Sequence, residues 1–133
     1  MAKIFVYGTL MNNMNAFVPD AQLLFDNVEV DGFAMYSLGG FPGIVETAAR
    51  HDKVYGQIWE IPTSGWNRLD QYEGFDSENP DGSLYRRLRL PMGYVHPQPN
   101  MNEAFLRSRV EYYHYNSIYR EERRVANGRW GVA

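Results

Sequence analysis

The sequence contains no cysteine. Disulfide bonds, thiolate nucleophiles and cysteine-ligated metals are therefore all excluded. A surplus of basic residues is also missing, because 13 Lys and Arg stand against 16 Asp and Glu, which gives a net charge of −3. Nucleic-acid-binding domains usually present a strongly basic surface, so we expect no nucleic-acid partner.

Long apolar runs are absent as well. No stretch approaches the ~20 apolar residues that a membrane-spanning helix needs, so we expect no membrane contact. The first residues reach Gly8 too early to form the apolar segment of a secretory signal. We therefore expect a cytoplasmic protein. Its 133 residues suit a single domain over residues 1–133.

Familiar cofactor and nucleophile motifs are missing too. The three histidines, His51, His96 and His114, are scattered without the short spacings of metal ligands. No Gly-x-Ser-x-Gly elbow of a serine hydrolase occurs. The glycine turn near the start lacks both the lysine of a phosphate-binding loop and the spacing of a dinucleotide fingerprint. We expect no metal and no other cofactor.

Aromatic and β-branched segments are what the chain has instead. Aromatic residues make up 15% of it, with ten tyrosines. Short apolar or alternating segments predict five to seven strands, within residues 3–7, 21–38, 44–46, 54–61, 84–90 and 110–115. Strands and helices do not alternate regularly, which disfavours a doubly wound sheet. We expect an α+β fold with a closed or nearly closed sheet and helices packed on its outside.

The first expected strand breaks at Tyr7-Gly8-Thr9-Leu10. A glycine turn after a strand can present bare backbone N–H groups to an anion. Because the lysine of a phosphate-binding loop is absent, a small carboxylate is the favoured guest. The alternative is an ordinary strand-to-loop turn without a ligand.

A glutamate, Glu73, stands at the end of an expected helix that Gly74 terminates. Its neighbours include Trp66, Tyr72 and Phe75. If Glu73 is buried, desolvation and the negative end of the helix dipole both raise its pKa. A carboxyl group of raised pKa can accept and donate a proton near neutrality. The alternative is a solvated glutamate in a last helical turn.

Tyr85 and Arg87 lie two apart on an expected strand and therefore on one face. They are either a wall of the same pocket, orienting the substrate or Glu73, or a rim pair that packs and solvates itself. The tyrosines of residues 110–115 alternate, and core packing is their expected role. Arginines after residue 118 are interleaved with Glu121 and Glu122, which is typical of a solvated helical face.

Several short segments follow one another in a recognisable order. They are Val6-Tyr7-Gly8-Thr9-Leu10, Gly43-Ile44-Val45, Val54 to Ile61, Leu69 to Gly74, and Tyr85-Arg86-Arg87. In this order they resemble the γ-glutamylcyclotransferase-like family, and above all its branch of γ-glutamylamine cyclotransferases and AIG2-like proteins. The closing Asn127-Gly128-Arg129-Trp130 is similar to that branch's C-terminal Gly-x-Trp, although Arg129 stands where an acidic residue is common. The resemblance spans residues 4–130.

The resemblance implies a mixed β-barrel with peripheral helices and a site for a small γ-glutamyl substrate. It implies that the backbone of Tyr7, Gly8, Thr9 and Leu10 receives the glutamyl moiety. It places Glu73 as the general acid and base, and the pair Tyr85 and Arg87 at the family's Tyr-x-Arg. No cofactor is implied, and a monomer or a homodimer is expected.

The implied reaction splits a γ-glutamyl amide by internal attack. The substrate's own α-amino nitrogen attacks its γ-carbonyl, which gives 5-oxoproline and a free amine without a nucleophilic side chain. Two alternatives stay open. One is a non-catalytic member of the same fold that binds a ligand or another protein, and the other is an amide hydrolase in which Glu73 activates water.

Overall fold

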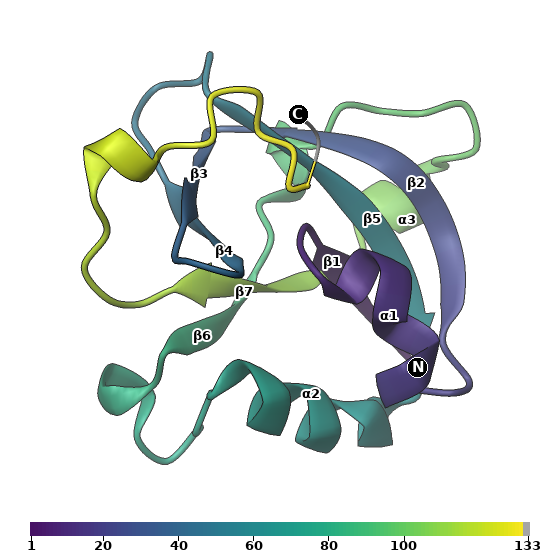
Figure 1. The fold of residues 1–133 in the computed structure, drawn as a ribbon. Coiled ribbons are helices and arrows are strands. Elements are labelled where there is room, and N and C mark those ends of the chain that lie inside the picture. The colour runs from purple at the N-terminus through teal and green to yellow at the C-terminus, as the bar shows by residue number, and fades with distance from the viewer. Residues whose placement is uncertain (132–133) are drawn as a thin grey trace.

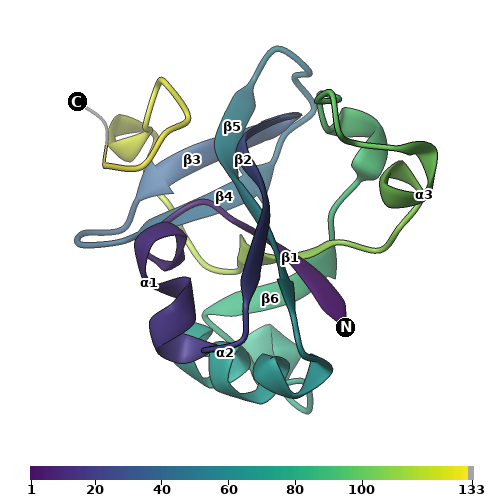
Figure 2. The same cartoon turned by 90° about the vertical axis from the view of Figure 1, so that its right-hand side faces the viewer.

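The computed structural model describes residues 1–131, which contain seven strands. Five of them form one mixed sheet in the order β2-β5-β1-β7-β6 (Figure 1). Their bounds are β1 Ala2–Val6, β2 Gln22–Asp31, β5 Lys53–Ile61, β6 Tyr85–Arg89 and β7 Glu111–Tyr115. The other two, β3 (Phe33–Ser37) and β4 (Pro42–Glu46), pair with each other as an antiparallel hairpin. The hairpin crosses the direction of β2 and β5 (Figure 2).

Strand β1 is the centre of the large sheet. It runs antiparallel to β5 and parallel to β7. Alternate side chains point to opposite faces of a strand. Ile4 and Val6 thus pack in one apolar cluster, while Phe5 and Tyr7 pack in the other. Burial on both faces explains why this strand reads as a nearly continuous apolar run.

Three short α-helices accompany the strands: α1 (Leu10–Phe17), α2 (Trp66–Glu73) and α3 (Glu103–Leu106). Leu10 and Met14 of α1 and Trp66 and Leu69 of α2 are buried in the same cluster as Ile4. The two helices therefore cover one face of β1, next to the point where β1 ends. No helix in residues 1–131 is long and apolar enough to cross a membrane.

The predicted closure into a barrel is wrong. β2 and β6 are the two edges of the five-stranded sheet, and the β3–β4 hairpin forms a separate two-stranded sheet. The hairpin lies against β7, but a side chain takes the place of a ladder there, since the N–H of Glu46 donates to Nε2 of His114 at 3.0 Å. The α+β class and the number of strands agree with the prediction.

Two predicted glycine roles are confirmed. Gly74 follows α2 in the left-handed region, with φ 69°, and its N–H donates to carbonyls of the last helical turn, as a C-cap does. Gly56 lies inside β5 where a Cβ atom would be 2.2 Å from the carbonyl oxygen of Val6. A glycine inside a strand indicates either a bend or the close approach of another group, and at Gly56 the structure shows the close approach of the neighbouring strand.

The less regular segments also follow the sequence in part. The Asn-rich stretch after Leu10, expected as a loop or a short helix, is α1. Residues 91–109 contain only a 3-10 turn, Met92–Tyr94, and the four-residue α3. The charged tail has one 3-10 turn, Glu121–Arg123, in place of a longer helical segment.

Candidate active site

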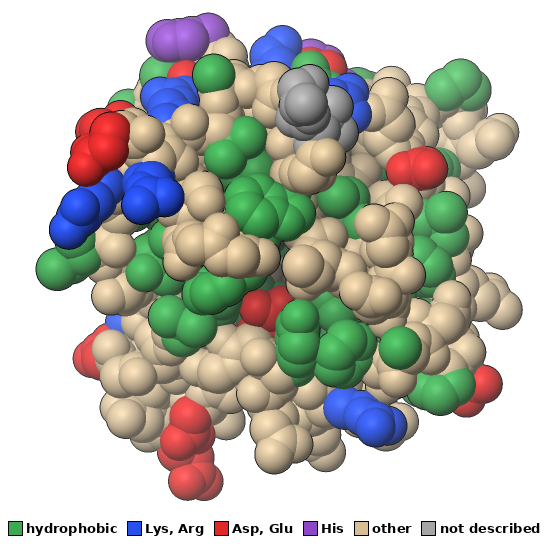
Figure 3. All heavy atoms as spheres, viewed as in Figure 1, with side chains coloured by type: hydrophobic (Ala, Val, Ile, Leu, Met, Phe, Trp, Pro, Cys, Tyr) green, Lys and Arg blue, Asp and Glu red, His purple; other side chains and the backbone are tan. Residues whose placement is uncertain are grey.

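A cavity of about 390 Å³ opens where four segments meet: the β1–α1 turn, the β3–β4 hairpin, the end of α2 and the start of β6. This volume is in the usual range for small-molecule sites. In the space-filling view an acidic side chain lies in a hollow ringed by hydrophobic ones (Figure 3). The lining residues are Phe5, Val6, Tyr7, Gly8, Thr9, Leu10, Gly40, Phe41, Pro42, Tyr72, Glu73, Leu84, Tyr85 and Tyr113.

Glu73 is the one acidic residue among the described residues that line this cavity. Its carboxylate has no hydrogen bond or ion pair within residues 1–131. Burial against the apolar wall raises the pKa of Glu73 from its ordinary 4.5 to about 7. This direction agrees with the sequence prediction, and it leaves a group that changes protonation near neutrality.

Three buried tyrosine hydroxyls surround the same space. The hydroxyl of Tyr7 donates to the carbonyl of Tyr113 at 2.6 Å, and that of Tyr85 donates to the carbonyl of Pro42 at 2.6 Å. The hydroxyl of Tyr113 donates to Oδ1 of Asp70 at 2.7 Å. Burial, and to a smaller extent the charge of Glu73, raises the pKa of all three phenols. Since each hydroxyl proton is engaged, only oxygen lone pairs remain for a guest, and these suit a donor such as an ammonium group.

Another wall of the cavity is the turn from β1 into α1. Helix α1 begins at Leu10 without a side-chain cap. Thr9, the residue placed to cap it, has its Oγ1 3.1 Å from the hydroxyl of Tyr72 instead. The first N–H groups of a helix lack intrahelical acceptors and lie at the positive end of its dipole. This end of α1 can therefore hold an anion.

Gly8 fits this turn because nothing larger does. A Cβ atom on it would lie 2.8 Å from Cγ of Pro42 in the hairpin. The backbone of the turn at Gly8 therefore lies directly against Pro42 of the hairpin. The hydroxyl of Tyr85 holds the same residue through its carbonyl group. The contact sets the width of the cavity between the hairpin and β1.

The structure brings together six of the seven predicted site residues: Tyr7, Gly8, Thr9, Leu10, Glu73 and Tyr85. The bend at Gly8 and the carboxylate of Glu73, 65 positions later in the sequence, lie on one cavity. Their roles in binding and proton transfer stay predictions.

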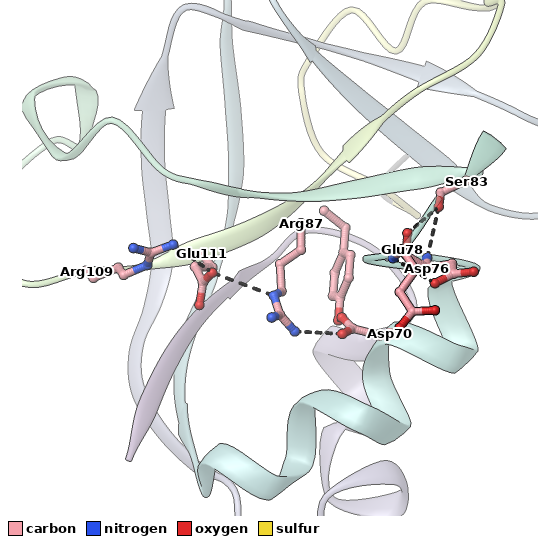
Figure 4. Close-up of polar contacts among 8 residues, drawn as sticks. Asp70, Asp76, Glu78, Ser83, Arg87, Arg109 and Glu111 are labelled. Atoms are coloured by element: carbon pink, nitrogen blue, oxygen red, sulfur yellow. Dashed lines mark hydrogen bonds and ion pairs between the residues drawn. The ribbon is translucent and has the colours of Figure 1, made fainter. Parts of the chain in front are cut away.

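Arg87 is the exception, because it does not line the cavity. Its Nη1 lies 2.7 Å from Oδ2 of Asp70 and its Nε 3.6 Å from Oε1 of Glu111 (Figure 4). Its guanidinium carbon lies 4.3 Å from the ring centroid of Trp66. The expected wall role is therefore corrected: β6 passes along α2, so Tyr85 lies near the helix end at Glu73, whereas Arg87 lies farther back along the helix and joins it to β7.

Sequence reasoning missed six residues of the cavity wall, all of them outside β1 and its turn into α1. In the sequence the hairpin turn is a glycine-rich loop with no other indication of a site. Phe41, Tyr72 and Leu84 are 40%, 47% and 42% exposed although they are large and hydrophobic. For Phe41 and Leu84 the available signal was a large apolar residue inside or beside a glycine-rich or polar loop, whereas Tyr72 lies in α2 and had no such signal. The missed residues are Gly40, Phe41, Pro42, Tyr72, Leu84 and Tyr113.

A second polar group, away from the cavity, could hold a cation. Ligand atoms of Glu29, Asp31 and His96 lie within 4.8 Å of one another. Nε2 of His96 is 2.8 Å from Asp31 and 3.0 Å from Glu29, and Nζ of Lys53 is 3.2 Å from Glu29. The side chains satisfy one another as an ion-pair network, which the scattered histidines of the sequence did not reveal.

Comparison with known proteins connects this geometry to a family. The family model described as gamma-glutamyl cyclotransferase, AIG2-like, matches residues 4–132. A Vibrio cholerae protein provisionally named a gamma-glutamylcyclotransferase is 31% identical over 94 residues, which are 68% of this chain and 74% of the relative. The gamma-glutamylcyclotransferase family protein YtfP of Escherichia coli K12 is 34% identical over 70 residues, 51% of this chain and 58% of the relative.

Solved structures show the same fold. The solution structure of Escherichia coli YtfP superposes with a TM-score of 0.63 at 24% identity and covers 97% of this chain and 96% of its own. The crystal structure of a mouse AIG2-like protein gives a TM-score of 0.62 at 24% identity, covering 92% of this chain and 82% of its own. Since the family model spans almost the entire sequence, the chain belongs to the AIG2-like gamma-glutamyl cyclotransferase family.

Proposed function

We propose that this protein is a γ-glutamyl cyclotransferase that cleaves a γ-glutamyl amide into 5-oxoproline and a free amine. One observation carries the proposal: Glu73, which has a pKa of about 7 and no hydrogen-bond or ion-pair partner among residues 1–131, shares a cavity with the start of α1, where no side chain caps the helix. The ammonium group of an α-amino acid can bind to Glu73, and its carboxylate can bind at the start of α1. Membership of the family supports the same reaction.

The glutamyl unit binds with its two charged groups apart. Its α-carboxylate accepts hydrogen bonds from backbone N–H groups of Gly8, Thr9 and Leu10, where the helix dipole favours an anion. Its α-ammonium donates to Glu73 and to phenol oxygens such as that of Tyr85. Binding of both groups bends the glutamyl chain, so that its γ-carbonyl carbon lies close to the α-nitrogen. Ordered intramolecular attack of this kind can lower a barrier by about 7–11 kcal/mol.

Glu73 then moves protons, one at a time, from the attacking nitrogen to the departing one. Its carboxylate takes a proton from the α-ammonium and frees the nitrogen lone pair. The nitrogen attacks the γ-carbonyl carbon, and a C–N bond closes the five-membered ring. The protonated Glu73 gives its proton to the departing nitrogen as the original amide bond breaks. The regenerated carboxylate takes the extra proton that the new ring nitrogen still carries, which leaves a neutral lactam N–H, and passes that proton to the free amine. A pKa near 7 suits a group that must serve as base and acid in one cycle.

The test is product analysis by mass spectrometry with a panel of γ-glutamyl amides. We expect the wild type to release 5-oxoproline and Glu73→Gln to fold but release none. Release of glutamate in place of 5-oxoproline would identify the hydrolase alternative. Tight binding of every amide without any product would identify a non-catalytic binding protein, and unchanged turnover by Glu73→Gln would refute the role of this side chain.

A further inference from the structure

The cavity has a buried interior and an exposed apolar mouth. Its interior residues, among them Val6, Tyr7 and Tyr85, are at most 6% exposed. At the mouth lie Phe41, Tyr72 and Leu84, which we call the rim, and each is at least 40% exposed. Large hydrophobic side chains gathered in this way on a protein surface usually mark a binding site.

The rim residues are held in place. The hydroxyl of Tyr72 is bonded to Thr9, and its ring lies 4.3 Å from that of Phe17. The N–H of Leu84 donates to the carbonyl of Gly74 at 3.0 Å. The residue before it, buried Ser83, accepts from the N–H of Asp76 at 2.9 Å (Figure 4). Side chains fixed at a mouth cost little entropy when a ligand covers them.

Phe41 faces them from the other side of the mouth. Its carbonyl accepts from the N–H of Leu38 at 2.9 Å, which closes the hairpin turn. Gly39 in that turn has φ 111°, a conformation that side chains disfavour. The turn therefore has a defined shape that presents Phe41 to the cavity.

The mouth offers no compensation for a charged ligand group. Among the described residues that line the cavity there is no Lys, Arg or His, and Glu73 is the one anion. A second carboxylate on a substrate would lose water without gaining a cation, and it would approach Glu73. An uncharged apolar group would instead cover the rim and leave its own hydration shell.

We propose that the rim selects the leaving group, and that the amine released by this enzyme carries a bulky uncharged hydrophobic body, of the arylalkyl or long-chain alkyl class. The inference rests on the proposed function, because that function places the charged glutamyl unit inside, at Glu73 and the start of α1. The substituent on the departing nitrogen then extends outward to Phe41, Tyr72 and Leu84. Amino acids and peptides, which add a carboxylate there, are disfavoured leaving groups.

The experiment compares three amides by kcat/KM for 5-oxoproline release. γ-Glutamyl-phenethylamine and γ-glutamyl-phenylalanine differ only in one carboxylate, and γ-glutamyl-ethylamine lacks the ring. We expect the phenethylamide to exceed each of the other two at least tenfold. Leu84→Ala should lower kcat/KM for the phenethylamide by a larger factor than kcat/KM for the ethylamide.

A charge introduced at the mouth tests the electrostatic half of the inference. Gly40 lines the cavity, and a Cβ atom there would have no atom within 4 Å. Gly40→Lys should raise kcat/KM for the phenylalanine amide several-fold above that of the matched Gly40→Gln variant. No such gain is expected for the phenethylamide.

The outcomes separate the two proposals. If the phenylalanine amide or the ethylamide is cleaved as well as the phenethylamide, the rim does not select the leaving group, while the cyclotransferase function stands. If no γ-glutamyl amide yields 5-oxoproline, the proposed function fails and this inference fails with it.

Discussion

Asp70 and Glu73 lie one turn apart on α2, yet within residues 1–131 only Asp70 has hydrogen-bond and ion-pair partners. Asp70 binds Arg87 at 2.7 Å and accepts from the hydroxyl of Tyr113 at 2.7 Å. Glu73 has neither a cation nor a hydrogen bond within residues 1–131. One carboxylate thus anchors the helix to the sheet, and the anchored helix holds the other where its proton can be exchanged.

The burial of Glu73 has a consequence for stability. Below pH 4.5 its carboxyl is neutral in the folded and the unfolded chain. Between pH 4.5 and about 7 the unfolded chain releases this proton while the folded chain keeps it, so stability falls as the pH rises. The loss is complete above the folded pKa and is of the order of 2–3 kcal/mol.

Glu73→Gln removes this titration. The free energy of unfolding of the variant, relative to the wild type, should therefore increase from pH 4.5 to 8, by roughly 2–3 kcal/mol. Urea unfolding of both proteins at several pH values measures it. A difference that does not vary with pH would mean that the pKa of Glu73 is not raised in the folded protein.

The protonation of Glu73 should also control activity: stability falls as the pH rises, whereas activity should increase. Glu73 must be ionised to accept a proton from the substrate, so kcat/KM should rise with pH through about 7. This profile reports the free enzyme. A rise centred near pH 4.5, the ordinary pKa of a glutamate, would mean that the catalytic base is not a buried carboxylate with a raised pKa.

Arg87 is predicted to position α2 without touching the substrate. Arg87→Ala leaves Asp70 without its cation and uncovers Trp66, and we expect about 2–4 kcal/mol of lost stability. Arg87→Lys keeps the charge but loses the planar stacking and the two-sided contact to Asp70 and Glu111, so it should restore only part of this. Thermal unfolding measures stability, and kcat should fall more than KM rises because Glu73 moves with the helix.

Two glycines of the cavity wall form a matched pair. Gly8→Ala places a methyl group against Pro42 and should cost about 1–3 kcal/mol, while the turn shifts and KM rises. Gly40→Ala enters open space and should change the free energy of unfolding by less than about 0.5 kcal/mol. Equal stability of the two variants would show that the hairpin yields to the added methyl group.

The sequence predicted those parts of the fold that depend on local pattern. Alternation located the strands. Gly74 indicated a helix end, as found, and Gly56 indicated a bend or a close approach, of which the structure shows the close approach. Closure of the sheet could not be read in the same way. A strand pattern shows which face is buried, but whether β4 and β7 form a ladder depends on which group meets the N–H of Glu46, and that group is the imidazole of His114.

The residues of the candidate site also fall into two groups, those that local sequence pattern indicates and those that depend on how distant segments pack. Gly8 and Glu73 stood out because each breaks its local pattern: a glycine ends an apolar strand, and a carboxylate stands at a helix C-terminus. Arg87 was misplaced because strand alternation gives the face of a residue but not the element that crosses it. Phe41 and Leu84 stand out as apolar residues in loops, but the sequence does not show that their two loops, far apart along the chain, meet at one opening.

The central position of β1 also bears on how the molecule assembles. Its neighbours are β5 and β7, so the N-terminal strand is flanked on both sides only when Glu111–Tyr115 has joined it. Pairings between such distant segments form slowly. Until Glu111–Tyr115 joins the sheet, the edge of β1 that faces β7 is unpaired, and this edge is where chaperone dependence and aggregation during synthesis are expected.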